Sequence, residues 1–166
     1  MAALNFFVPI DDECASTSSA IFYLYDDENQ TPVYFSTQKT RNYCTEVDNQ
    51  SVQKIILRPV DHVIYPENGV IHCDAFLHDV SRRTLCFVEM KNVQKGWVPE
   101  AVDQLEQTVN DFNAAHNAIT SAALYKRAYA ANSKHPCFSS SHATQIRDFR
   151  RRTGFVLRIE NTVKLP

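Results

Sequence analysis

The order of apolar and polar positions predicts a chain whose first half is mainly strand. Residues 20–25 and 33–35 are rich in aromatic and apolar side chains and flank an acidic break, which predicts a β-hairpin. Further strands are expected over 60–65, 70–77 and 84–91. The last of these is almost continuously apolar, which is typical of a strand buried on both faces of a sheet.

Helical spacing appears first over residues 48–57. Val52, Ile55 and Ile56 recur at i, i+3 and i+4, and Pro59 follows them. This spacing predicts a first helix that ends before the proline.

The second half alternates between helices and strands. After Pro99, apolar residues step by three and four positions and predict a helix that reaches about residue 118. Residues 123–130 predict a strand, residues 141–153 another helix that ends at Gly154, and residues 155–159 a final strand. Strands that alternate with helices are typical of an α/β protein.

Length and composition suit one soluble domain. The chain has 166 residues, of which 44% are hydrophobic and 22% charged, so extensive disorder is not expected. No apolar run is long enough for a membrane helix, and the first residues lack the basic segment of a signal peptide. The cysteine count is five, an odd number without a C-x-x-C pair, which favours free thiols and a cytoplasmic location.

The small net charge of −2 hides an uneven distribution. Residues 1–80 contain four basic and twelve acidic residues, a balance of −8, whereas residues 81–166 contain thirteen basic and seven acidic residues, a balance of +6. The basic extreme consists of four arginines that could contact nucleic-acid phosphates, namely Arg147, Arg150, Arg151 and Arg152. The alternative interpretation is a solvated helix face that pairs with acidic residues.

Three charged residues stand at the ends of apolar strands. Glu89 and Lys91 share one face of the strand over 84–91, because side chains two positions apart point the same way. Pairing with the preceding strand would bring Asp74 near Glu89. Two adjacent carboxylates repel each other, and a divalent cation between them removes that penalty.

This arrangement resembles the PD-(D/E)xK nuclease superfamily. The matching residues are Asp74, then Glu89-Met90-Lys91 after fourteen intervening residues, followed by an amphipathic helix. The resemblance implies a mixed four-stranded sheet flanked by helices, in the order α-β-β-β-α-β, over residues 45–131. Residues 1–44 would then form an N-terminal β extension, and residues 132–166 a C-terminal helix and strand of the same single domain.

The resemblance also assigns roles to these residues. Asp74, Glu89 and the carbonyl of Met90 would hold Mg²⁺ or Mn²⁺, and Lys91 would orient or activate the attacking water and offset charge on the phosphorus centre.

Three more residues are candidates for the same site. Exonuclease-like branches of the superfamily carry a glutamine on the helix after the motif, for which Gln104 is the preferred candidate here. Glu46 could complete the site from the first predicted helix, although it precedes that helix. His72 could contact the residues that bind the metal without binding it itself, or it could be a structural histidine.

The expected activity is metal-dependent hydrolysis of phosphodiester bonds in DNA or RNA. One alternative is a binding or assembly subunit that has the nuclease fold but no activity. The other is a small immunity or regulatory protein whose acidic half imitates nucleic acid. Nucleic acid is the expected partner, a protein partner or self-association stays open, and no membrane partner is expected.

Overall fold

The computed structural model describes residues 4–7, 9, 15–27, 31–65, 69–134 and 142–166. The described part contains three helices: α1 (Val98–Ala115), α2 (Asn117–Ala122) and α3 (Ala143–Thr153). No helix in these ranges is long and apolar enough to cross a membrane.

A mixed six-stranded sheet forms the centre of the molecule, with the strand order β1-β5-β6-β7-β8-β9. The strands are β1 (Ala15–Thr17), β5 (Ile55–Pro59), β6 (Ala75–Asp79), β7 (Thr84–Lys91), β8 (Tyr125–Asn132) and β9 (Val156–Ile159). The pairs from β1 to β7 are antiparallel, whereas β7, β8 and β9 run parallel and are linked through helices.

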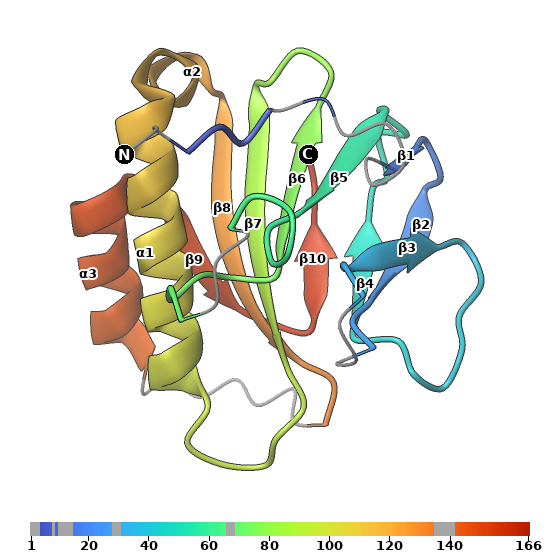
Figure 1. Ribbon diagram of the computed structural model, residues 1–166. Helices are drawn as coiled ribbons and strands as arrows, with labels where there is room; N and C mark the ends of the chain where they lie inside the picture. Colours follow the sequence, from blue (N-terminus) through green and yellow to red (C-terminus); the bar gives the residue numbers. More distant parts are fainter. Residues whose placement is uncertain (1–3, 8, 10–14, 28–30, 66–68, 135–141) are drawn as a thin grey trace.

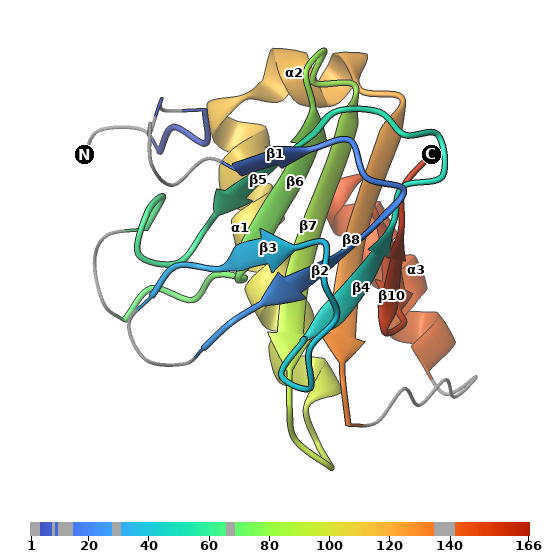
Figure 2. The same cartoon turned by 90° about the vertical axis from the view of Figure 1, so that its right-hand side faces the viewer.

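A second, four-stranded sheet has the order β10-β4-β2-β3. It consists of β2 (Ile21–Tyr25), β3 (Tyr34–Ser36), β4 (Thr45–Asp48) and β10 (Thr162–Lys164). Helices α1 and α3 lie on one side of the large sheet, and the second sheet lies on the other side (Figures 1 and 2). The central sheet is therefore buried on both faces, against two separate hydrophobic clusters.

Several predicted elements are confirmed nearly residue for residue. Strand β7 covers 84–91 as expected, and seven of its eight residues are buried. Helix α1 buries the predicted apolar stripe against the large sheet and carries a proline in its first turn. Helix α3 ends where Gly154 adopts a φ of 78°, a left-handed conformation that residues with a Cβ rarely adopt. The hairpin strands β2 and β3 also pair as expected.

The helix predicted over 48–57 is wrong. The segment instead forms a turn between β4 and β5, in which Val52 has a φ of 55°. Asn49 does not cap a helix, because its side-chain amide donates to the carbonyls of Ser19 and Gln53, at 3.1 and 2.9 Å. Apolar spacing over so few residues also fits a strand, and pairing with β6 decides in favour of β5.

The strand predicted over 60–65 is also wrong. The amides of Ile64 and Tyr65 both donate to the carbonyl of Val60, at 3.1 Å, and these hydrogen bonds fold the segment into a turn. All three side chains consequently reach the same cluster beneath the helices, which an alternating strand would not allow. The strand predicted over 70–77 begins later, at Ala75.

The central sheet has six strands and not four. Strands β1 and β9 extend the four strands β5 to β8 at its two edges. The second sheet was not expected beyond its β2–β3 hairpin. Strand β4 joins it by antiparallel pairing with β2, and β10 joins it by parallel pairing with β4, between residues more than a hundred positions apart. Local sequence patterns contain no record of such pairing.

Candidate functional site

The candidate site lies where β6 begins and β7 ends. Asp74 directly precedes β6, and its amide donates to the carbonyl of Val88 at 3.2 Å. Its side-chain Oδ2 accepts the amide hydrogen of Met90 at 2.7 Å. This hydrogen bond replaces a ladder bond that β6 no longer supplies and fixes the Asp74 carboxylate beside β7.

Glu89 is the most deeply buried carboxylate of the site, with 2% of its surface exposed. It lies on the helix-facing side of β7, two residues after Phe87 of the cluster beneath the helices. Its Oε1 pairs with the ammonium of Lys91 at 3.0 Å, while its Oε2 is buried without a hydrogen-bond partner. An unpartnered buried oxygen on a carboxylate is costly for folding and requires an explanation.

Lys91 lies between two carboxylates. Besides Glu89, it contacts Oε1 of Glu100 in the first turn of α1, at 3.3 Å. Lys91 is 16% exposed, whereas Glu100 is 70% exposed. The ammonium group therefore links the end of β7 to the start of α1.

Helix α1 is also attached to the segment that precedes β6. Gln104 donates through Nε2 to the carbonyl of His72 at 3.2 Å, and its Oε1 is buried without a partner. One turn further along the helix, the Thr108 hydroxyl accepts the amide hydrogen of Cys73 at 2.8 Å. These bonds hold α1 against Asp74 and its neighbours.

The environment of the two carboxyl groups raises both of their pKa values. Burial is the main cause for Asp74, whose pKa rises from 3.8 to about 7. Burial and the nearby charge of Asp74 raise the pKa of Glu89 well above its ordinary value. Burial alone would lower the pKa of Lys91, but Glu89 and Glu100 outweigh burial and raise it. Strong perturbation of adjacent groups is typical of functional sites.

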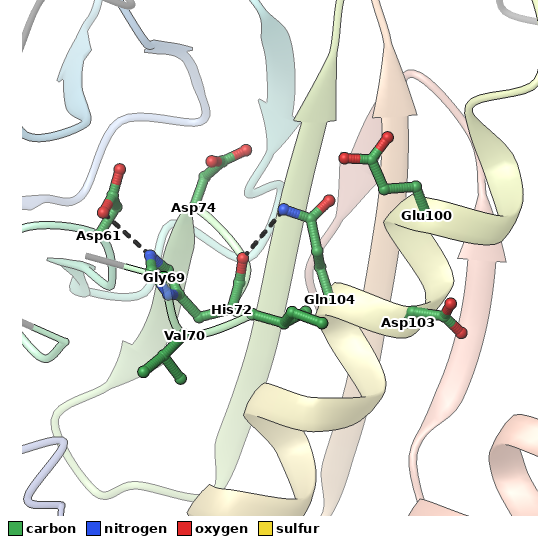
Figure 3. Close-up of a pocket in the computed structure, with 9 residues that line it drawn as sticks. Asp61, Gly69, Val70, His72, Asp74, Glu100, Asp103 and Gln104 are labelled. Carbon is green, nitrogen blue, oxygen red and sulfur yellow. Dashed lines mark hydrogen bonds and ion pairs between the residues drawn. The ribbon is translucent and has the colours of Figure 1, made fainter. Parts of the chain in front are cut away.

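A pocket of about 410 Å³ opens beside this cluster. Figure 3 shows Asp61, His72 and Asp74 at one side of the pocket, and Glu100, Asp103 and Gln104 of α1 at the other. His72 is held in place by Oδ1 of Asp61 at 2.9 Å and by stacking on Tyr65, with ring centroids 4.8 Å apart. The predicted residue His72 thus lines the pocket through its side chain and contacts Gln104 through its carbonyl.

The oxygen atoms around Asp74 and Glu89 are of the chemical type that divalent cations such as Mg²⁺ bind. Glu89 and Gln104 each bury an oxygen without a partner, and Asp74 lies next to Glu89. The Met90 carbonyl is directed to the same strand edge as its amide, which binds Asp74, because both groups of one strand residue point the same way. Within the described ranges, no three His, Cys, Asp or Glu side chains group closely enough to hold a metal ion. A cation here would therefore need backbone, water or substrate oxygens as well, as Mg²⁺ commonly does.

Other predicted residues lie elsewhere. Glu46 is on β4, next to Val47, which packs between the two sheets, so alternation directs Glu46 to the opposite face. Three of the arginines form ion pairs on the surface: Arg152 with Glu106, and Arg147 and Arg151 with Asp148. The fourth, Arg150, is also exposed.

The structure describes three of the five cysteines that were predicted to be free thiols. Cys44, Cys73 and Cys86 carry free thiols, and burial raises the pKa of each. Cys14 and Cys137 lie outside the described residues.

Sequence reasoning missed three acidic residues near the site. The charge of Asp26, which follows β2, raises the pKa of Asp74, although these residues belong to different sheets. The sequence does place Glu100 in the first turn of a predicted helix. Acidic residues are common there because they stabilise the helix, so this position alone does not indicate a functional role. Asp61 lies in the segment that was wrongly expected to be a strand.

Comparison of the chain with protein-family models, curated proteins and solved structures gives no match. Functional inference for this chain therefore rests on its own residues.

Proposed function

We propose that the chain is a metal-dependent nuclease of the PD-(D/E)xK type that hydrolyses phosphodiester bonds in DNA or RNA. The observation that carries the proposal is the pair of adjacent carboxyl groups of Asp74 and Glu89, the second of them buried, two residues before a half-buried lysine that pairs with Glu89. Two adjacent carboxylates repel each other when both are ionised, so ionising the second of the pair is costly in the absence of a cation. A bound cation would remove that cost.

Asp74, Glu89 and the Met90 carbonyl would hold Mg²⁺ or Mn²⁺ in this proposal. The bound ion would supply a water nucleophile at neutral pH and neutralise phosphate charge. Strand order supports the assignment, since β5, β6 and β7 are antiparallel neighbours and β8 returns parallel to β7 through α1. The first helix of the superfamily pattern has no counterpart over 48–57.

Lys91 would act in its charged, protonated form. Its ammonium lies between two carboxylates, which favour the charged form, so it can donate hydrogen bonds to the attacking water or to a phosphate oxygen. Glu100 is exposed and pairs with Lys91 from outside, so an incoming phosphate oxygen could replace it. Gln104 would orient water or substrate through its unpartnered Oε1.

The exposed arginines of α3 are proposed to contact the nucleic-acid backbone. Arg147 and Arg151 keep about three quarters of their side chains exposed, at 74% and 76%, despite their contact with Asp148. Arginines so exposed can exchange one surface carboxylate for a phosphate at little cost, because exposed ion pairs are weak. The free thiols of the three described cysteines are consistent with the reducing cytoplasm proposed for this protein.

A non-catalytic binding subunit is the second candidate. The observation that favours it is that Lys91 pairs with both Glu89 and Glu100. These two ion pairs connect β7 to α1, which is a structural role that needs no catalysis. The two candidates differ in whether the site has chemical activity.

The experiment incubates the protein with single- and double-stranded DNA and RNA in Mn²⁺, in Mg²⁺ and in EDTA. We expect cleavage that requires the metal and that disappears in Glu89→Gln, a variant of equal size. The matched control is Glu46→Gln, because Glu46 lies on the second sheet and faces away from the site. Absence of cleavage on all four substrates, or equal cleavage by the Glu89→Gln variant, would overturn the nuclease proposal.

A further inference from the structure

The pocket beside the candidate site is rich in hydrogen-bond acceptors. Four carboxylates line it, those of Asp61, Asp74, Glu100 and Asp103. Carboxylates accept hydrogen bonds and repel phosphate, so the lining around Asp61 and Asp103, which have no role at the proposed metal site, is unsuited to the backbone of a nucleic acid. A ligand that fits must offer N–H groups.

One wall of the same pocket is apolar and exposed. Val70 and Ile71 line it and leave 43% and 58% of their surface uncovered. They follow Gly69, whose φ of 95° turns the chain at the pocket edge. Apolar side chains beside a row of acceptors suit a flat ligand that has apolar faces and a polar edge.

The remaining wall is held rigidly before any ligand arrives. His72 is fixed between Asp61 and the Tyr65 ring, and the Tyr65 hydroxyl donates to Asp111 on α1 at 2.6 Å. Figure 3 shows the His72 ring directed toward Asp61 along the side of the pocket opposite α1. Such preorganisation reduces the entropy lost on binding.

We propose that this pocket binds a nucleobase with an amino group where uracil and guanine have a carbonyl oxygen, namely cytosine (C4) or adenine (C6), in the nucleotide next to the cleaved phosphate. The inference rests on the proposed function, which places the phosphate at Asp74 and Glu89. The amino group would donate to Asp61 or Asp103, the two lining carboxylates that have no role in the proposed metal and phosphate site, while the faces of the base would contact Val70 and Ile71. Uracil and thymine present a carbonyl oxygen at the corresponding position, which the carboxylates repel. A volume of about 410 Å³ lies in the range of pockets that take one small ligand.

Free nucleosides test the pocket apart from cleavage, because they contain no phosphate. Metal-free protein is titrated with cytidine and with uridine, and binding is followed by NMR chemical shifts. The two differ at C4, which carries an amino group in cytidine and a carbonyl oxygen in uridine, and at N3, which carries a hydrogen only in uridine. We expect cytidine to bind at least about fivefold more tightly than uridine. Val70→Ser and Asp103→Asn should reduce this ratio, whereas Val80→Ser should not, since Val80 is equally apolar and 63% exposed but does not line the pocket.

Each outcome has a defined meaning. Equal binding of the two nucleosides, or a preference that survives both pocket variants, would overturn the inference even if the protein cleaves nucleic acid. A cytidine preference without cleavage would keep the pocket assignment and reject the nuclease proposal. Arginine amide is the third probe, and its binding in preference to cytidine would overturn the inference in favour of a basic peptide.

Discussion

Replacing Asp74 with asparagine should stabilise the metal-free protein at neutral and alkaline pH. Asparagine keeps the size of the side chain and an oxygen that can accept the Met90 amide hydrogen, now bound at 2.7 Å. It removes the charge that burial disfavours, since the Asp74 pKa is raised from 3.8 to about 7.

The sign and size of the effect follow from this pKa. Because the folded-state pKa lies above the unfolded one, ionisation of Asp74 costs nothing below pH 3.8, and its cost grows until about pH 7. At 1.36 kcal/mol per pH unit, the full cost is about 4 kcal/mol above pH 7. The asparagine amide needs a new acceptor, so we expect a net gain of about 2–4 kcal/mol at pH 8. A chain of this length gains about 2–4 °C in Tm per kcal/mol.

Urea denaturation of both proteins, in EDTA at pH 4 and pH 8, measures the effect. At pH 4 the variant should be as stable as the wild type or up to about 2 kcal/mol less stable, because the amide lacks its acceptor at every pH, and the difference in its favour should be largest at pH 8. Addition of Mg²⁺ should reduce the advantage of the variant, because at a concentration of 100 Kd it stabilises only the wild type, by about 2.7 kcal/mol. A variant that is less stable than the wild type at pH 8 in EDTA, or that gains equally from Mg²⁺, would refute this reasoning.

Three further predictions concern other parts of the molecule. Lys91→Ala should destabilise the protein by about 3–5 kcal/mol, because it leaves Glu89 buried without its cation, and adding Glu89→Gln should recover much of this loss in thermal denaturation. Burial lowers the pKa of His78 to about 4. The free energy of unfolding should therefore decrease by about 3 kcal/mol as the pH falls from 6.5 to 4, and His78→Gln should flatten this pH profile in urea titrations. Alanine at Arg147, Arg150 and Arg151 together should make the salt dependence of duplex DNA binding shallower by about 3 in log–log slope, and an unchanged slope would exclude these phosphate contacts.

The sequence alone determined the elements whose signals are local and long. Strand β7 is recognisable because eight residues in a row suit a doubly buried strand, and α1 because its apolar stripe persists over four turns. Gly154 marks the end of α3 since a left-handed residue is needed there. The relation of Glu89 to Lys91 likewise follows from the period of a strand, without tertiary information.

Tertiary structure decided every feature that depends on pairing between distant segments. The pattern at Val52, Ile55 and Ile56 suits helix and strand alike, and only the pairing of β5 with β6 makes it a strand. Proximity of Asp26 to Asp74 depends on how the second sheet lies across the first. The ion pair between Lys91 and Glu100 depends on where α1 begins relative to the end of β7. A local pattern fixes which face a side chain points to, but burial and partners depend on contacts between residues far apart in the chain, so only the folded structure fixes them.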